Sequence, residues 1–244
     1  MNNGERIVKK FLQKFGILIR KYTPGSSEEL RRTKLFAHHE IDMVFDIGAN
    51  KGQYAKGIMD NGYTGRIVSF EPLSAVHQKL SREASGHARW TVADRCAVGS
   101  NTGEAVIHIA ANSVSSTLSN MLSSHTEGAP ESAIVSSEKV QVETLDHLAS
   151  KYAKKEDRLF IKIDVEGFEE EVLKGGQDTL ARAIGVEMEI SIVPLYENQN
   201  FLLPMVLNYM QEKGFTLVSI TTGFTDFKTG EVLQCNGIFY RKKR

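Results

Sequence analysis

The sequence predicts an α/β domain built on a Rossmann-like, doubly wound, mostly parallel sheet of seven strands, with one antiparallel strand near the C-terminus. From residue 41 onward, short apolar runs typical of buried strands alternate with amphipathic helical patterns. The strands are apolar on both faces, as in sheets covered by helices on both sides. The chain has 244 residues, which is enough for one domain with a full core.

The N-terminal part of the chain, residues 1–24, is predicted to be an amphipathic helix and a linker, and residues 25–244 the main domain. Apolar residues recur at helical spacing between residues 5 and 22, beside lysines and arginines. Thr23, Pro24 and Gly25 then interrupt the pattern. Such a basic helix fits against the domain itself, against a second copy in a homodimer, or against an anionic membrane surface.

The elements of the main domain follow in alternating order. The first helix ends at a glycine, and Ser74 is expected to be the N-cap of the second. Strands are expected at 43–47, 66–70, within 89–98, at 159–165, 184–190, 215–221 and 237–241, and helices at 53–61, 74–83, 169–180 and 203–213.

About 60 residues separate the third and fourth strands, far more than a usual connection. Residues 103–111 fit a small hairpin, and 140–149 fit a strand that leads into a helix. The part between them is rich in serine, alanine and glycine and shows little periodicity. We therefore expect a lid-like insertion at about 103–139, either an element that covers the acceptor or plain surface disorder.

The strongest motif is the stretch Asp46-Ile47-Gly48-Ala49-Asn50-Lys51-Gly52, which leaves the first strand and enters a helix. Gly48 and Gly52 allow close approach of the backbone to a ligand. The third glycine of the dinucleotide fingerprint is missing, and there is no P-loop. The Asp46 carboxylate would repel a pyrophosphate but suits S-adenosylmethionine, which carries an ammonium and a sulfonium. Asn50 and Gln53 are further candidates for binding this cofactor.

Two more acidic residues lie near the ends of the next strands. Glu71 can accept hydrogen bonds from both ribose hydroxyls, and Asp94 can bond the adenine amino group, with Ala97 packing nearby. Simpler roles are a helix cap for Asp46, a surface charge for Glu71 and a turn residue for Asp94. The order of these residues at three successive strand ends favours the cofactor site.

Several short motifs together resemble one family, and they extend over about residues 41–241. The chain is similar to FkbM-type methyltransferases, a branch of the class I S-adenosylmethionine-dependent enzymes. This resemblance implies O-methylation of sugars, polyketides or related natural products, often in glycolipid or polysaccharide pathways, and leaves the acceptor open. The motifs are VFDIGANKGQY at 44–54, FEP at 70–72, AVG at 97–99, ETLD at 143–146 and IKIDVEGFE at 161–169.

The fourth and fifth predicted strands carry charged residues at alternating positions. Lys162, Asp164 and Glu166 interleave with apolar residues, as do Glu187 and Glu189. Charges on a covered sheet are costly unless they pair with one another or meet a ligand. We therefore expect a polar cluster of one lysine and up to four carboxylates near the strand ends.

Methyl transfer to a hydroxyl requires a group that removes the proton. Glu166 or Asp164 is the favoured base, with His125 of the insertion as a third candidate. Asp164 is alternatively a contact for the methionine end of the cofactor, and Lys162 a structural partner of Glu187. The carboxylates could also hold a divalent metal ion, but nothing in the sequence fixes a ligand geometry, so no metal site is predicted.

Composition narrows the class of partner. Thirty basic and thirty acidic residues cancel, which argues against a nucleic-acid substrate. The family resemblance implies a small molecule, glycan or glycolipid as acceptor. Two distant cysteines are expected to be free thiols, as in a cytoplasmic protein, with the inner membrane surface as a peripheral location. Two other functions stay open at this point, a nicotinamide-dependent oxidoreductase and a non-catalytic cofactor-binding module.

Overall fold

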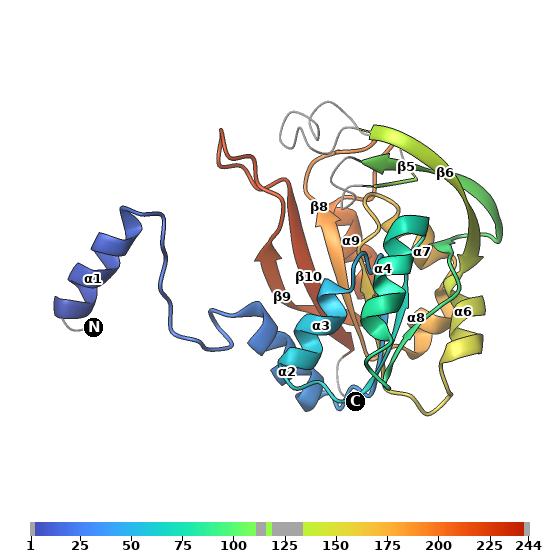
Figure 1. Cartoon of the computed structure of the whole chain (residues 1–244), viewed down its shortest axis with the longest axis horizontal. Helices are drawn as coiled ribbons and strands as arrows, with labels where there is room; N and C mark the ends of the chain where they lie inside the picture. The colour runs from blue at the N-terminus through green and yellow to red at the C-terminus, as the bar shows by residue number, and fades with distance from the viewer. Residues whose placement is uncertain (1–2, 111–115, 119–133, 242–244) are drawn as a thin grey trace.

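A seven-stranded sheet forms the centre of the protein in the computed structural model, which describes residues 3–110, 116–118 and 134–241 (Figure 1). The strand order is β3-β2-β1-β7-β8-β10-β9. β10 is antiparallel to both of its neighbours, and the other pairs are parallel, as predicted. The strands are β1 (Met43–Ile47), β2 (Arg66–Phe70), β3 (Trp90–Val92), β7 (Leu159–Ile163), β8 (Gly185–Ser191), β9 (Phe215–Thr222) and β10 (Gln234–Arg241).

Helices cover both faces of this sheet, which is why every residue of β1 is buried. On one face, Phe45 and its neighbours pack against α6 (Leu145–Tyr152), the helices that follow β7, and α9 (Leu203–Glu212). On the other face, Val44 lies in a separate core that joins the sheet to three helices near the N-terminus. These are α2 (Glu28–His38), α3 (Gln53–Asp60) and α4 (Ser74–Ala84).

A second, three-stranded sheet follows β3 and was only partly predicted. It has the order β4-β6-β5, in which β5 and β6 are antiparallel, and it caps the upper edge of the domain in Figure 1. β5 begins the expected insertion, and β6 leads into α6, as expected. Residues 111–115 and 119–133 lie outside the described residues, so the lid-like role of the insertion stays a prediction. Its strands are β4 (Ala97–Gly99), β5 (Gly103–Ala110) and β6 (Ile134–Thr144).

The N-terminal helix is shorter than predicted. α1 spans Asn3–Gln13, whereas the apolar pattern predicted a helix to residue 22. Gly16 has a φ of 71°, and its N–H and that of Ile17 bond back to the carbonyls of Gln13 and Leu12. This is the Schellman arrangement that ends helices, and it overrides the apolar pattern that continues beyond it.

Two boundaries near the later motifs also differ from prediction. Residues 169–180 form two helices, α7 (Glu169–Lys174) and α8 (Gln177–Arg182), separated by Gly175 and Gly176. A Cβ on Gly175 would lie 2.0 Å from the carbonyl oxygen of Gly99, so the chain bends where β4 approaches it. β7 ends at Ile163 rather than at residue 165.

The prediction of Ser74 as an N-cap is also wrong. Leu73 occupies that position, and Ser74 is the first residue of α4. The backbone N–H and the hydroxyl of Ser74 instead donate to the carboxylate of Glu138, each at 2.7 Å. A side chain from β6 thus replaces the cap and ties α4 to the second sheet.

Candidate active site

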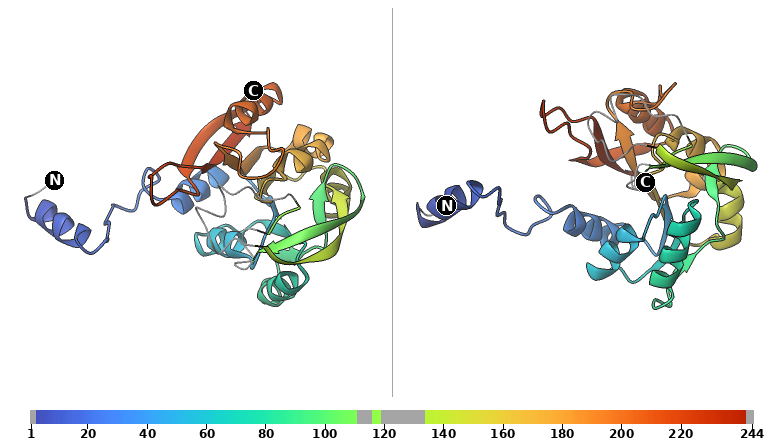
Figure 2. Two further views of the ribbon diagram at one scale, coloured as in Figure 1. Left: turned by 90° about the horizontal axis from the view of Figure 1, so that it is seen from above. Right: turned by 45° about the horizontal axis from the view of Figure 1, so that its top comes forward.

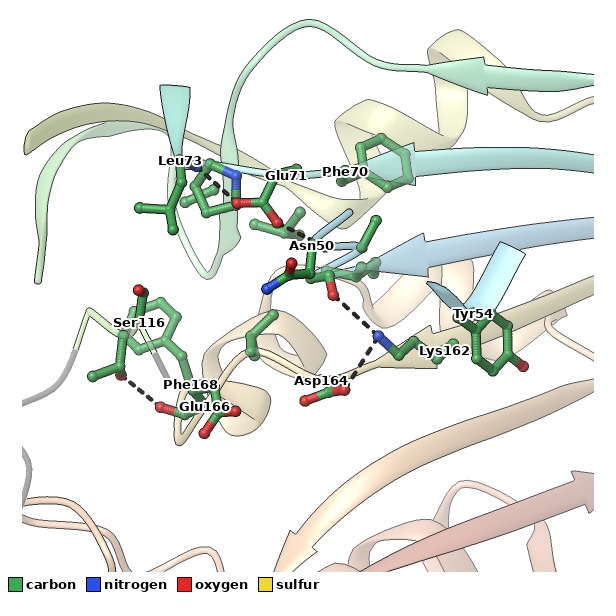
Figure 3. Close-up of a pocket in the computed structure, with 18 of the residues that line it drawn as sticks. Asn50, Tyr54, Phe70, Glu71, Leu73, Ser116, Lys162, Asp164, Glu166 and Phe168 are labelled. Atoms are coloured by element: carbon green, nitrogen blue, oxygen red, sulfur yellow. Dashed lines mark hydrogen bonds and ion pairs between the residues drawn. The ribbon is translucent and has the colours of Figure 1, made fainter. Parts of the chain in front are cut away.

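A cavity of about 380 Å³ opens beyond the carboxyl ends of β1, β2 and β7 (Figure 3). This is where parallel sheets with helices on both faces bind their ligands, and the volume falls within the usual range for small-molecule sites. The walls come from the turns after these three strands, from α2 and α3, and from the second sheet. The lining includes Gly48, Asn50, Gln53, Tyr54, Glu71, Ala97, Thr117, Asp164, Glu166 and Phe168.

The turn from β1 into α3 has the close packing that its glycines predict. Gly48 has a φ of 76°, and a Cβ there would lie 1.8 Å from the backbone oxygen of Asp164. Gly52 has a φ of 85°, and its Cβ would lie 2.4 Å from the Trp90 ring. Gly52 therefore does not line the cavity and serves packing, whereas Gly48 brings the β1 and β7 turns together.

Glu71 lies at the end of β2, as predicted, and faces the cavity. Its side chain is almost fully buried, and its two oxygens accept the backbone N–H groups of Asn50 and Leu73, each at 2.9 Å. Burial raises the pKa of Glu71 to about 7, although these hydrogen bonds favour the ionised form. The two turns thus hold the carboxylate in one orientation beside the cavity.

Asp46 does not reach the cavity, which corrects the prediction of a direct ligand contact. Its side chain is completely buried, lies 3.3 Å from the Lys162 ammonium and accepts the Ser69 hydroxyl at 3.2 Å. The indole N–H of Trp90 donates to Ser69 in turn. Burial raises the pKa of Asp46, and Lys162 opposes that rise. Lys162 therefore compensates the charge of Asp46, so this carboxylate does not act by repelling a phosphate.

Lys162 contacts both the buried Asp46 and the groups that line the cavity. Its ammonium lies 3.3 Å from Asp164 and donates to the carbonyl of Gly48 at 3.1 Å. Burial opposes the positive charge, but Asp164 and Asp46 outweigh burial and raise the pKa of Lys162. The predicted pairing of Lys162 with Glu187 is wrong, because Arg32 of α2 binds Glu187 at 2.7 Å.

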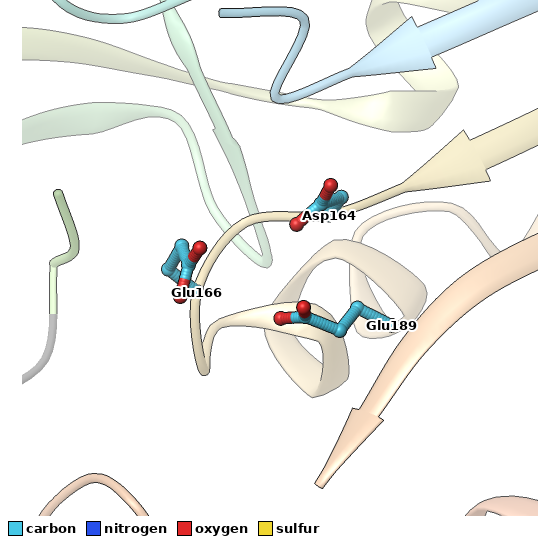
Figure 4. Close-up of side chains that lie close together, drawn as sticks. All are labelled: Asp164, Glu166 and Glu189. Atoms are coloured by element: carbon cyan, nitrogen blue, oxygen red, sulfur yellow. The ribbon is translucent and has the colours of Figure 1, made fainter. Parts of the chain in front are cut away.

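Three carboxylates of the predicted polar cluster lie close together, and two of them, Asp164 and Glu166, line the cavity. Oxygens of Asp164, Glu166 and Glu189 lie within 4.8 Å of one another (Figure 4). Because β7 ends at Ile163, Asp164 and Glu166 lie in the following turn and not on a strand face. Such oxygens could bind a divalent cation. Glu189 also accepts a hydrogen bond from Gln234 at 2.7 Å.

Contacts from two distant segments fix both the side chain and the backbone of Glu166, and the sequence pattern did not predict these contacts. Its φ of 55° is a left-handed conformation, and its carboxylate accepts the Tyr196 hydroxyl at 2.5 Å. The hydroxyl of Thr117 donates to the backbone oxygen of Glu166 at 2.5 Å. Burial, followed by repulsion from Asp164, raises the pKa of Glu166 to about 8. The next residue, Gly167, has no room for a Cβ against the Tyr196 ring.

The remaining predicted residues divide into two groups. Asn50, Gln53 and Ala97 line the cavity, as expected for cofactor-binding residues. Asp94 does not, because its side chain is 92% exposed and forms an ion pair with Lys151 at 3.2 Å. His125 lies outside the described residues.

Comparisons with known proteins decide the family. The model of the methyltransferase FkbM domain matches residues 46–217, well over half of the chain. The chain belongs to the FkbM methyltransferase family. The protein is therefore an S-adenosylmethionine-dependent methyltransferase. No curated protein matches the chain.

Solved structures that resemble this FkbM protein are distant. The methyltransferase domain of bacterial CtHen1-C is 7% identical with a TM-score of 0.48, over 91% of this chain and all of that one. An rRNA methylase from Streptococcus thermophilus is 12% identical with a TM-score of 0.46, over 93% of this chain and all of that one. Likeness at this level does not bear on the acceptor.

The residues around the cavity fit the methyl donor of the FkbM family. The cofactor carries hydroxyls on its ribose, and Glu71 presents a carboxylate fixed by two backbone N–H groups. It also carries an ammonium and a sulfonium, and Asp164 and Glu166 face the same cavity. The cavity thus offers carboxylates to a cofactor that carries hydroxyls and positive charges.

Sequence reasoning missed several residues of this FkbM site. Tyr196 lies in the segment after β8, and Arg32 and Tyr54 come from helices that line one end of the cavity. Tyr54 donates to Glu187 at 2.8 Å. Tyr54 ends the motif at 44–54 but was given no role, and no motif marked Tyr196 or Arg32, because these roles come from tertiary contacts between distant segments. The only available signal was that Glu187, a charge on a buried strand, needed a partner.

Proposed function

We propose that the protein transfers a methyl group to a hydroxyl of a sugar, glycolipid, polysaccharide or related natural product, with Glu166 as the general base. The observation that carries this proposal is the environment of Glu166. Its carboxylate faces the cavity, is fixed by Tyr196 and has a pKa raised to about 8. A base with a pKa near the working pH combines availability with proton affinity.

The methyl donor is proposed to lie along the turns after β1, β2 and β7. Glu71 accepts hydrogen bonds from the ribose hydroxyls, and Gly48, Asn50 and Gln53 line the adjoining wall. Ala97 packs near the adenine ring. Asp164 faces the cationic methionine end. When bound, the cofactor would supply a methyl group on a sulfonium, with the thioether S-adenosylhomocysteine as the leaving group when the acceptor oxygen takes the methyl carbon.

The chain's own contribution to the reaction is positioning and proton removal. Ionised Glu166 accepts the proton of the acceptor hydroxyl, and Tyr196 keeps the carboxylate in place by donating to its second oxygen. Lys162 forms an ion pair with Asp164 at 3.3 Å and so fixes the position of that side chain at the side of the site. The left-handed backbone at Glu166 costs about 1–3 kcal/mol, which the surrounding contacts offset.

The acceptor class is supported by the mixture of groups around the cavity. Carboxylates and the Thr117 hydroxyl can bond sugar hydroxyls, and Phe168 and Leu118 offer apolar surface. The overall charge balance of the chain does not favour a nucleic acid, so we propose none as substrate. The oxidoreductase alternative is not retained, because the chain belongs to a methyltransferase family.

The deciding experiment is a methyl-transfer assay with labelled S-adenosylmethionine and a panel of sugars and glycolipids, measured across pH. We expect an O-methylated product and a rate that rises with pH up to about 8, because Glu166 must lose its proton first. A bound sulfonium favours the ionised form and moves this limb to lower pH. Glu166→Gln is expected to lose at least ~100-fold in kcat and to lose the pH limb.

Tyr196→Phe separates a positioning role from a merely structural one. Removing the hydroxyl takes a hydrogen bond from the ionised form of Glu166, so the rising limb is expected to shift to higher pH while cofactor binding stays unchanged. An unchanged pH profile in Glu166→Gln would remove Glu166 as the base. Binding of S-adenosylhomocysteine without turnover on any acceptor would support the non-catalytic module instead.

A second candidate mechanism uses a divalent cation, held by three carboxylates, to activate the acceptor hydroxyl. It is favoured by the short separation of Asp164, Glu166 and Glu189. In that case a chelator would abolish turnover and added Mg²⁺ would restore it. If turnover survives the chelator, the carboxylates act without a metal.

A further inference from the structure

The N-terminal segment, residues 3–22, stands apart from the domain. In Figures 1 and 2, α1 and the connection after it extend away from the body of the protein in every view. The tether is near Tyr22, whose hydroxyl donates to Asn61 at 2.8 Å, just beyond α3. Among the helices in the described part of the chain, none combines the length and apolar character needed to span a bilayer.

This segment concentrates exposed apolar side chains. Val8, Phe11 and Leu12 lie on one side of α1, and Phe15 continues their spacing just beyond the end of the helix. The rings of Phe11 and Phe15 meet edge to face, with their centroids 5.2 Å apart. Phe11 is 59% and Phe15 66% exposed. After the Gly16 turn, Ile17, Leu18, Ile19 and Tyr22 are also exposed. Seven of the fifteen large hydrophobic side chains exposed in the described residues lie between Val8 and Tyr22.

The same segment carries a strong positive charge. It holds one acidic and six basic residues, whereas the rest of the chain has 24 basic and 29 acidic residues. At 100° per residue, Lys9 and Lys10 lie on the arc of α1 opposite the apolar side, and Lys14 follows the helix directly. A basic arc beside an apolar side is the pattern of helices that lie in the plane of a membrane interface.

We propose that the N-terminal segment docks the protein on an anionic lipid surface. The apolar side chains enter the boundary between headgroups and acyl chains, and the lysines and arginines meet lipid phosphates. Charge complementarity favours this occupant over a second copy of the segment, because two copies would bring like charges together.

The attachment point gives this docking a consequence for the cavity. Tyr22 is bonded to Asn61, just beyond the C-terminal end of α3, and Gln53 and Tyr54 at the start of the same helix line the cavity. Docking therefore brings the attachment point to the lipid, with the 8 residues of α3 between that point and the cavity. The inference does not depend on which hydroxyl is methylated, because vesicle binding is independent of turnover.

Flotation of the full chain with vesicles tests the proposal. We expect binding to phosphatidylcholine vesicles that contain phosphatidylglycerol, little binding to phosphatidylcholine alone, and release by high salt. Phe11→Ser with Phe15→Ser, and separately Lys10→Glu with Lys14→Glu, are each expected to lower the partition coefficient at least ~10-fold. The matched control is Phe227→Ser with Lys228→Glu on the connection before β10, where Phe227 is 94% exposed.

The outcomes are distinct. Wild-type protein that ignores anionic vesicles, or segment variants that bind as well as wild type, would overturn the proposal. A self-association in sedimentation that the same variants abolish, without vesicle binding, would assign the segment to a second copy. Unchanged S-adenosylhomocysteine binding in all variants shows that the domain is folded and separates this test from that of the methyltransferase site.

Discussion

Burial decides which acidic residues at the strand ends take part in the site. Glu71, Asp46 and Asp94 occupy similar places in the sequence pattern, each at or near the end of a strand. The structure gives Glu71 two backbone donors beside the cavity, pairs Asp46 with Lys162 beneath it, and leaves Asp94 in solvent. Position along the chain predicted the site's location, whereas tertiary packing alone assigned the roles.

Cofactor binding separates Glu71 from Asp94 directly. Glu71→Ala is expected to weaken binding of S-adenosylhomocysteine by ~1–3 kcal/mol, the cost of losing hydrogen bonds to a charged group. Asp94→Ala is the matched control and should bind as wild type, because its exposed side chain does not line the cavity. Calorimetry measures both. Equal loss in the two variants, or none in either, contradicts the assignment of Glu71.

At the scale of elements, apolar periodicity predicted the core strands well and the interruptions poorly. The bounds of β1 and β2 agree with the pattern, because continuous burial leaves a strong signal. The breaks at Gly16 and at Gly175–Gly176 depend on local backbone hydrogen bonds and on close approach by another segment. Periodicity carries neither kind of information. The second sheet was hard to predict because β4 has only three residues.

The Gly175 bend is a testable consequence of that close approach. Gly175→Ala would place a Cβ 2.0 Å from the carbonyl oxygen of Gly99, so α7 or β4 must shift. We expect a loss of about 1–3 kcal/mol in the free energy of unfolding, measured with urea. Gly86→Ala, at a position with no atom within 4 Å of the added Cβ, should change it little. Because the change from glycine to alanine by itself lowers the entropy of the unfolded chain and so favours the fold, an equal loss in both variants would contradict the steric explanation for Gly175.

At the scale of the whole molecule, buried carboxylates collect at one end of the sheet. Burial raises the pKa of Glu71 and Glu169 to about 7, and that of Glu166 to about 8. Between the ordinary value of 4.5 and these values, the folded state binds more protons than the unfolded state. The free energy of unfolding therefore falls as pH rises through this window. This loss of stability is the consequence of burying carboxylates at the end of the sheet where we propose that the cationic cofactor binds.

Thermal unfolding at several pH values tests this distribution of charge. We expect the Tm of the ligand-free protein to fall between about pH 5 and pH 8, and Glu166→Gln to flatten the fall. S-adenosylmethionine should raise the Tm most at the upper end of the range, where the carboxylates are ionised. A Tm that rises over the same range would mean that the acids are stabilised in their ionised form by contacts other than those described.

Trp90 provides an optical signal from one place in the protein, in addition to its role in packing. It is the single tryptophan of the chain, and it lies buried against Gly52 with its indole N–H bonded to Ser69. Ser69 donates to Asp46, which forms an ion pair with Lys162, and Lys162 lines the cavity. All intrinsic tryptophan fluorescence therefore originates at the foot of the β1 turn, which makes the emission spectrum a label-free optical reporter of that turn.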